Sequence, residues 1–222
     1  MRHRIWPLLL AATICFAVLM ALGIWQVQRS AWKNALVAEI DKRLAEKPVA
    51  ISDLRNRPAA SDGTLVKVKA IGHFKPKQLR KISVLNGGAG WEILQGFEFA
   101  SGGDILISRG VASQPVDQAY PEQDIEVIGL LRRHGQDRKQ QRGFFDPDNN
   151  PVANQWYWWD VPAMRGAADL RFVTHVSIVL HLLPGSPGAE GLFVEPPKAN
   201  LRNNHLGYAI TWFGLAASLL AV

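Results

Sequence analysis

The chain has 222 residues, of which 48% are apolar and 20% are charged, and its formal net charge is +6. These values are ordinary for a folded domain, so they exclude an intrinsically disordered chain and a collagen-like fibre. The charge is unevenly distributed, because segments 5–28 and 203–222 contain no Asp, Glu, Lys or Arg. The sequence therefore predicts a polar domain between two apolar segments of membrane length, a pattern that is not typical of a soluble enzyme.

The first apolar segment, residues 5–28, is predicted to be a transmembrane helix that follows a cytoplasmic tail of residues 1–4. Roughly 20 apolar residues cross the hydrocarbon core of a bilayer as a helix, and this segment meets that requirement. A cleaved signal peptide is the alternative, since basic residues precede the apolar run. The run is too long for that reading, and Trp25, Gln26 and Trp32 form an interfacial belt at its end.

The helical pattern continues through residues 29–47, up to Pro48, which ends the helix. Apolar side chains recur every four residues in this segment, and charged residues occupy the other faces. Such a membrane-proximal helix either docks on its own domain or extends as a stalk, and the spacing leaves both arrangements open.

The second apolar segment, residues 203–222, is predicted to be another transmembrane helix, which follows a domain of residues 48–202. Two spans place both chain ends on the same side of the membrane, and Arg2 and Arg4 favour the cytoplasmic side. The domain is then periplasmic. No Arg- and Ser-rich presequence precedes the first span, so the expected location is a bacterial inner membrane, with the chain as a multi-pass protein.

The two predicted spans are expected to pack against each other through small side chains. Small residues four positions apart lie on one helix face and let two helices approach closely. The first span carries Ala17 and Ala21 in this arrangement, and the second carries Gly214 and Ser218.

The domain between the spans shows the two-residue period of half-exposed strands. Strands are predicted over 65–70, 91–99, 105–107, 125–131 and 172–183. Turns are expected at the glycines of 87–90 and in a hairpin at 101–104, and one short helix over 162–169. The fold class is therefore a membrane-anchored α+β protein, in which two transmembrane helices flank a mostly antiparallel β outer domain, either a small barrel or a sandwich.

The common motifs of catalysis are missing from the sequence. Neither Gly-rich segment carries the Lys-Ser/Thr of a phosphate loop, and there is no Gly-x-Ser-x-Gly or His-x-x-x-His pattern. The single cysteine, Cys15, lies in the first span, which leaves no disulfide framework in the outer domain. Its four histidines, His73, His134, His175 and His181, are interpreted as scattered structural residues. We therefore expect no enzymatic activity, and no nucleic-acid binding outside a membrane.

Two segments of the outer domain leave alternatives open. Residues 132–142 contain five Lys and Arg and a single acidic residue, which indicates either a solvated loop or a surface for anionic lipid headgroups. Residues 156–159 are four consecutive large aromatics, and in a strand they would place rings on both faces. One face then enters the core, while the other is either covered or forms a binding surface.

The start of the second span carries the clearest candidate for a ligand site. His205, Tyr208 and Trp212 are spaced i, i+3 and i+7, and therefore share a helix face. A neutral imidazole at a membrane boundary, beside aromatic rings, is suited to bind a haem iron as an axial ligand. The alternative is an interfacial histidine that anchors the helix. Trp25 and Gln26 approach from the first span at a similar depth.

Several motifs, in order along the chain, resemble the surfeit locus protein 1 family from Leu22 to Ala216. They are Gly23-Ile24-Trp25-Gln26, Ile105–Gly110, Phe145–Pro151, Trp156–Asp160 and Arg202–Phe213. The family's hairpin strand ends in Asn-Arg-Gly, and Ser108 stands here in place of the Asn. The match of several motifs around two spans makes the resemblance specific.

The resemblance implies a two-span membrane factor for cytochrome c oxidase assembly, the biogenesis of respiratory complex IV, whose outer domain acts as a chaperone for subunit I. It also implies that haem a is bound transiently, with His205 as ligand of the haem iron and a surround of Tyr208, Trp212, Trp25 and Gln26. The implied partners are subunit I, other assembly factors such as haem a synthase, and the lipid bilayer. A scaffold that stabilises subunit I without binding haem is the alternative.

Two residues at predicted strand ends, Arg109 and Trp91, are expected to stabilise the outer domain. Arg109 closes one strand beside a glycine, and Trp91 opens the preceding strand. Neither is expected to contact haem.

Overall fold

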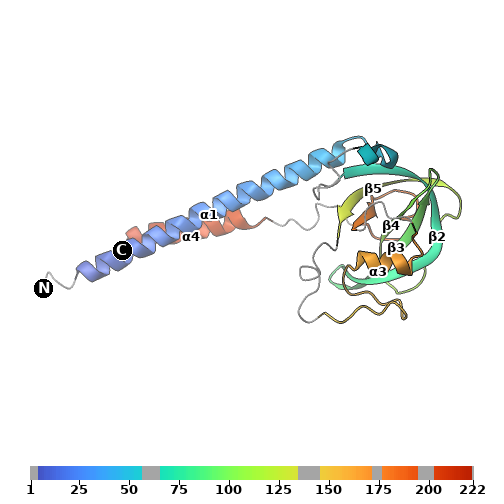
Figure 1. Ribbon diagram of the computed structural model, residues 1–222. Helices are drawn as coiled ribbons and strands as arrows, with labels where there is room; N and C mark the ends of the chain where they lie inside the picture. The colour runs from blue at the N-terminus through green and yellow to red at the C-terminus, as the bar shows by residue number, and fades with distance from the viewer. Residues whose placement is uncertain (1–4, 57–65, 135–145, 172–176, 195–202, 222) are drawn as a thin grey trace. The chain divides into compact units, whose positions relative to one another are not determined.

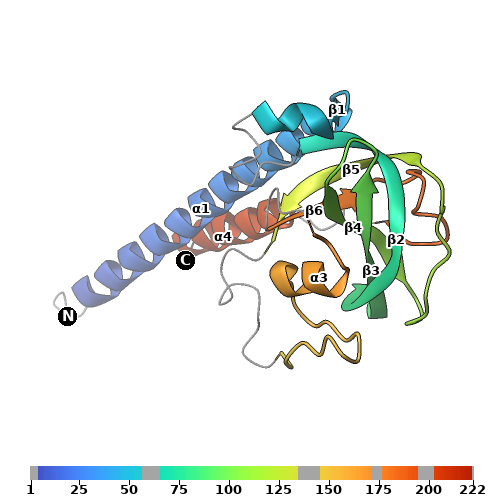
Figure 2. The same ribbon diagram turned by 45° about the vertical axis from the view of Figure 1, so that its right-hand side comes forward.

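The computed structural model describes residues 5–56, 66–134, 146–171, 177–194 and 203–221. Several sequence features fall outside these residues: the predicted tail 1–4, the basic segment 135–142, Phe145, His175, Arg202, and the first part of the strand predicted over 172–183. The chain divides into two units, which are described separately. One is a pair of helices, and the other, residues 43–196, is built around a β-sheet (Figures 1 and 2).

The first unit contains α1, which spans Trp6–Ala45 as one helix of 40 residues. Pro7 lies in its first turn, where a missing backbone N–H costs nothing, and the helix ends three residues before Pro48. The helix is about 60 Å long, and its charge-free part accounts for roughly 35 Å of this length. By length and composition α1 is able to cross a membrane. The predicted helix across residues 5–47 is confirmed, whereas the positions of its membrane boundaries stay predictions.

The second helix of this unit is α4, which spans His205–Leu220. Its 16 residues extend about 24 Å. Among the helices that the structure describes, α1 alone meets the length and hydropathy expected of a membrane span, and α4 is a shorter apolar helix. The second transmembrane span therefore stays a prediction.

The described part of the second unit contains six strands, which are β1 (Val49–Ala50), β2 (Val66–Leu85), β3 (Gly88–Phe99), β4 (Asp104–Ala112), β5 (Ile125–Arg133) and β6 (Ile178–Leu182). A short 3₁₀ helix, η2 (Ile51–Asn56), follows β1. β2 and β3 are joined by Asn86 and Gly87, whose φ angles of 51° and 82° are those of a two-residue hairpin. The prediction of a turn over 87–90 is wrong beyond Gly87, because Gly88 begins β3. The hairpin predicted at 101–104 is confirmed between β3 and β4.

The strands form one mixed sheet, which is mostly antiparallel as predicted. β2 pairs with β3 and with β5, β3 with β4, and β5 with β6, all antiparallel, whereas β4–β6 and β1–β2 are parallel. The 20 residues of β2 allow it to pair with β5 along its first part and with β3 beyond it. The pairings therefore run β2-β3-β4-β6-β5 and return to β2, so each of these five strands has a partner on both edges.

The two faces of the sheet bury separate hydrophobic clusters. One cluster includes Phe74, Phe97, Ile107 and Leu180, and the other includes Leu79, Leu94, Leu106, Val179 and Met164. Alternate residues of the same strands belong to the two clusters, because successive side chains of a strand point to opposite faces. Both faces of these strands are consequently covered.

A short helix, α3 (Val161–Ala167), covers the second cluster (Figure 2). Asp160 caps its start by accepting a hydrogen bond from the Ala163 N–H at 3.2 Å, and Pro162 lies in the first turn. This is the helix predicted over 162–169, and α3 begins one residue earlier.

The aromatic segment 156–159 is not a regular strand, although its rings still divide between two sides. Its backbone pairs with the sheet at one bridge, between Trp156 and Lys81. The Asn149 side chain supports the segment instead, because its Oδ1 accepts hydrogen bonds from the backbone N–H groups of Tyr157 and Trp158. Trp156 is fully buried and Trp158 is 8% exposed, while the other two aromatics are half-buried. Alternate rings are therefore buried (Trp156 and Trp158) and partly exposed (Tyr157 and Trp159).

Arg109 is the extra residue of a β-bulge. Leu94 of β3 pairs with Ser108, and the next residue, Ile93, pairs with Gly110, so Arg109 has no partner on β3. Gly110 has a φ of 136°, and a Cβ there would lie 2.9 Å from the Phe193 carbonyl oxygen. Glycine is therefore required after the arginine. The bulge gives a physical reason for the Ser-Arg-Gly motif.

The guanidinium of Arg109 is completely buried and lies among backbone carbonyls. Its Nε donates to the Gly188 oxygen at 2.6 Å, its Nη1 to Gln95 Oε1 at 2.9 Å, and its Nη2 to the Ala119 oxygen. Burial lowers the pKa of Arg109 to about 10, against the opposing effect of the Glu190 carboxylate, so the group stays charged at neutral pH. Arg109 contacts the domain core, as predicted, whereas Trp91 is only half-buried.

We predict that Arg109→Ala strongly destabilises the outer domain. Each buried carbonyl that loses its donor costs about 1–3 kcal/mol, against a total domain stability of about 5–15 kcal/mol. Urea unfolding of the detergent-solubilised protein, followed by tryptophan fluorescence, should show a loss of at least about 3 kcal/mol. Lys69→Ala is the control, since its exposed ion pair with Glu126 contributes about 0–1 kcal/mol. Equal midpoints for the two variants would contradict a structural role of Arg109.

Candidate functional site

The two helices of the first unit pack along a seam with a seven-residue repeat, and they lie side by side in Figures 1 and 2. Over residues 12–30 of α1, less exposed residues recur at 12, 16, 19, 23, 26 and 30, with 20 and 22 beside this stripe. In α4 they recur at 205, 209, 212, 216 and 219, with 213 beside the stripe. Alternating steps of three and four residues are the pattern of coiled-coil packing, in which one stripe of each helix faces its partner.

Gly23 is the point of closest approach in this seam. A Cβ at Gly23 would lie 2.5 Å from the Phe213 ring of α4, so a larger residue there requires this ring to move. Ala209 and Ala216 are the buried residues of α4. The prediction that Ala17, Ala21, Gly214 and Ser218 make the contact is wrong, because all four are exposed. They lie outside the seven-residue repeat that the seam follows.

Polar side chains join the helices at the end of the charge-free part of α1. Asn203, just before α4, donates its amide N–H groups to Ser30 Oγ at 3.2 Å and to Asn34 Oδ1 at 2.9 Å. Ser30 is 7% exposed, so its hydroxyl is satisfied inside the contact. These bonds fix how α4 starts relative to α1.

His205 and Gln26 form the central contact of the site. The His205 Nδ1 lies 2.7 Å from Gln26 Oε1. An amide oxygen only accepts hydrogen bonds, so Nδ1 carries the proton and the neutral ring keeps its lone pair on Nε2. The Trp25 ring stands edge-on to the imidazole, with 6.5 Å between centroids. The imidazole is thus held at one nitrogen and available for ligation at the other.

The structure brings together three of the five residues predicted for this site, namely Trp25, Gln26 and His205. Trp212 lies on the same stripe of α4, and its buried Nε1 has no hydrogen-bond partner among the described residues. Tyr208 is 58% exposed and lies outside the stripe. A residue three positions along a helix is rotated by about 60° from the first, which is enough to leave a narrow seam.

Two histidines of the outer domain also meet, which the sequence did not predict. The Nε2 atoms of His134 and His181 are 2.8 Å apart. The interpretation of these histidines as scattered residues is therefore wrong for this pair, although it holds for His73, which pairs with Asp124 at the surface. The two residues meet because β5 and β6 are neighbours, a pairing that sequence spacing does not reveal. No group of three or more metal-binding side chains occurs among the described residues.

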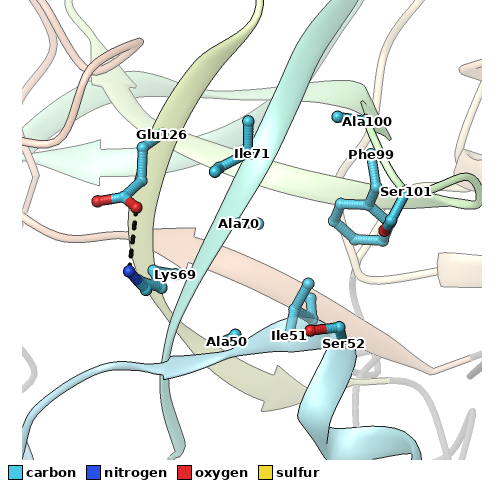
Figure 3. A pocket seen from close by; sticks show the side chains of 10 residues that line it. All are labelled: Ala50, Ile51, Ser52, Lys69, Ala70, Ile71, Phe99, Ala100, Ser101 and Glu126. Atoms are coloured by element: carbon cyan, nitrogen blue, oxygen red, sulfur yellow. Dashed lines mark hydrogen bonds and ion pairs between the residues drawn. The ribbon is translucent and has the colours of Figure 1, made fainter.

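The outer domain also contains an apolar pocket of about 260 Å³ between η2, β2 and the turn after β3. Ile51, Ile71 and Phe99 line it, and the Lys69–Glu126 ion pair lies at its edge (Figure 3). Pockets for drug-sized ligands are larger, at roughly 300–1,000 Å³. Most of the lining is apolar, so the pocket offers space for a small apolar group.

A long apolar helix near the N-terminus, a mostly β domain and a shorter apolar helix are consistent with a membrane protein. The model of the SURF1 family matches residues 13–217. The chain therefore belongs to the SURF1 family, whose members are assembly factors of cytochrome c oxidase. The resemblance derived from the sequence motifs is confirmed.

Three relatives show how far the similarity extends. Surfeit locus protein 1 of Homo sapiens is 27% identical, over 96% of this chain and 74% of its own length. The SURF1-like protein of Monosiga brevicollis is 30% identical, over 98% of this chain and 85% of its own length. The SURF1-like protein of the bacterium Rickettsia bellii is 26% identical, over 96% of this chain and 88% of its own length.

We predict that Gly23→Leu separates α1 from α4. Ser30→Cys and Asn203→Cys, in a Cys15→Ala background, place two thiols at positions whose side chains touch in the native protein. Oxidative cross-linking should be efficient in that parent and several-fold slower when Gly23→Leu is added. Gly214→Leu is the matched control, because a Cβ at Gly214 meets no atom within 4 Å. Unchanged cross-linking in Gly23→Leu would refute the close contact.

Proposed function

We propose that this protein binds haem a transiently through His205 and delivers it to subunit I of cytochrome c oxidase during assembly. The observation that carries the proposal is the hydrogen bond between His205 Nδ1 and Gln26 Oε1, at 2.7 Å. It selects the tautomer with a free Nε2, the atom that an imidazole offers to a haem iron. A hydrogen bond at the second nitrogen also raises the basicity of the ligating one and fixes the ring plane.

The surroundings of His205 fit an apolar macrocycle. Trp25 is 53% exposed and lies beside the imidazole, and the neighbouring surfaces of both helices are apolar. Haem a is poorly soluble in water, so a carrier needs a site at bilayer depth. One protein ligand gives moderate affinity, which transfer to an acceptor requires. Haem a is cargo in this proposal, and delivery needs no bond-making by the protein, which we therefore regard as a non-enzymatic chaperone.

The membrane arrangement belongs to the same proposal. Residues 5–28 and 203–222 would both span a bacterial inner membrane, with the tail 1–4 in the cytoplasm and the domain 48–202 in the periplasm. The 16 residues of α4, with the polar residues at its start in the interface, are just long enough for this. The ring of strand pairings supports a small barrel as the form of the outer domain.

The partners follow from this task. A haem carrier must meet the protein that makes its cargo and the protein that receives it, so haem a synthase and oxidase subunit I are the proposed neighbours in the bilayer. A scaffold that stabilises subunit I without haem is the second candidate. The same two helices would serve it, since the Gln26–His205 bond also anchors one helix to the other.

We predict that His205→Ala abolishes haem binding and preserves the fold. The residue is half-buried at a helix start, so its loss should change stability by no more than about 1 kcal/mol. Protein made in cells that produce haem a should purify with a haem absorption band, which His205→Ala loses or shifts at normal yield. Gln26→Leu should weaken binding by about 10–100-fold.

His73→Ala is the matched control and should keep the band, because that ring lies at the surface beside Asp124. An unchanged spectrum in His205→Ala would make another residue the ligand. Wild-type protein without haem in the same cells would favour the scaffold instead.

We predict that the outer domain is periplasmic and both chain ends are cytoplasmic. A phosphatase that is active only in the periplasm should report activity when fused after Lys47 and none when fused after Met1 or Val222. The net positive charge before the first span is the physical reason. Activity after Met1 with none after Lys47 would show the opposite topology. Activity after Val222 would show that the second apolar segment does not cross the membrane.

A further inference from the structure

One polar side chain from each of five positions forms a continuous row across the outer-domain sheet. The row consists of Lys81 in β2, Glu92 in β3, Ser108 in β4, His181 in β6 and His134 just after β5. It continues the sheet face that bears the cluster under α3, because Leu79, Leu94, Leu106 and Val179 each lie two residues away from a member of the row. The row is therefore mostly shielded from water.

The two imidazoles at the end of this row, His134 and His181, are positioned by packing and by backbone hydrogen bonds. Their Nε2 atoms are 2.8 Å apart. The Trp159 ring stacks on His134, with 4.0 Å between centroids and 19° between planes. The backbone N–H of His134 donates to the Ser177 oxygen at 2.6 Å, and His181 lies inside a strand that is paired on both edges. Neither ring is a loosely placed surface group.

Two facing Nε2 atoms at this distance share a single proton, so at least one of them presents a lone pair. Burial lowers the pKa of both His134 and His181, and the nearby Lys81 and Arg132 act in the same direction. Glu92 opposes this effect at His134. An imidazole binds a metal ion through such a lone pair, in its neutral form.

We propose that His134 and His181 together bind one divalent transition-metal ion of the Cu²⁺ or Ni²⁺ type through their Nε2 atoms. Two nitrogens at about 2.0 Å from an ion and about 90° apart are separated by about 2.8 Å. That is the separation observed here. A tetrahedral ion would hold them about 3.3 Å apart. When the ion binds, the proton between the two Nε2 atoms moves to the Nδ1 of its own ring, so that both imidazoles stay neutral. A limited rotation of each ring then directs both Nε2 lone pairs at the ion.

Glu92 supplies the outer support that metal-binding histidines usually have. Its Oε1 lies 3.8 Å from His181 Nδ1 and accepts a hydrogen bond from Ser108 Oγ at 2.7 Å. Its Oε2 accepts from Lys81 Nζ at 3.3 Å, so the lysine charge is paired. A carboxylate on the Nδ1 side favours the tautomer with the His181 proton on Nδ1 and leaves Nε2 for the ion.

The site would be open and exchangeable. Structural metal sites enclose the ion with four protein ligands, whereas this one offers two, and water completes the coordination. The His181 side chain is 17% exposed, which leaves a path for the ion. The site lies in the outer domain and does not involve His205. The proposal of a metal site is therefore independent of the proposal of haem binding.

The test uses the full-length, haem-free protein in detergent, stripped with a chelator and without an affinity tag. His3 is replaced by Gln throughout, because a histidine at the third position of a chain can itself bind Cu²⁺. We expect equilibrium dialysis to give one tightly bound Cu²⁺ per chain. Its electron paramagnetic resonance spectrum should show a tetragonal ion with two coupled nitrogens.

Single substitutions then assign the ligands. His134→Gln and His181→Gln should each weaken Cu²⁺ binding at least tenfold, and Glu92→Gln, which removes a charge 3.8 Å from His181 Nδ1, should weaken it less. His73→Gln should bind as the parent does. Circular dichroism checks that each variant is folded. Binding that is unchanged in His134→Gln and His181→Gln would overturn the proposal. A spectrum of the parent protein that shows fewer than two coupled nitrogens would also overturn the proposal. This measurement is informative even if the variants do not fold.

Discussion

The outer domain depends on the burial of one positive charge. Arg109 lies inside the ring of strands, and its guanidinium is stable there only because carbonyl oxygens from two separate loops, Gln118–Ala119 and Gly188, converge on it with Gln95. Those loops have no regular secondary structure of their own. The charge therefore orders them, and the bulge at Ser108–Gly110 directs the side chain inward.

Local features of this chain were predictable, and non-local ones were not. The two-residue period over 91–99, the hairpin at 101–104 and the Pro162 helix start depend on neighbours in sequence. The parallel pairing of β4 with β6 joins residues about 70 positions apart, and no local pattern records it. For the same reason the meeting of His134 with His181 could not be found. The support of the aromatic run by the Asn149 side chain, seven residues before it, was not visible in the spacing of the rings either.

The candidate haem site was predictable in composition but not in arrangement. Motif positions identified Gln26 and His205, and the structure adds the hydrogen bond between them. The helix contact was assigned to the wrong small residues, because size alone does not say which face of a helix is used. Gly23 is identified by its place in a seven-residue repeat with Gln26 and Ser30. Polar side chains in apolar surroundings form hydrogen bonds with each other. The same seven-residue repeat therefore brings Gln26 of α1 opposite His205 of α4.

Because of the seven-residue repeat, the Gln26–His205 hydrogen bond depends on how α1 and α4 are rotated about their axes relative to each other. One residue added to α1 between Gly23 and Gln26 would rotate the amide by about 100° away from the imidazole. Seven residues added at the same place would restore its direction almost completely. Such an insertion would still move the amide about 10 Å along the helix axis. The contact with His205 is therefore kept only if both helices change length by the same whole repeat.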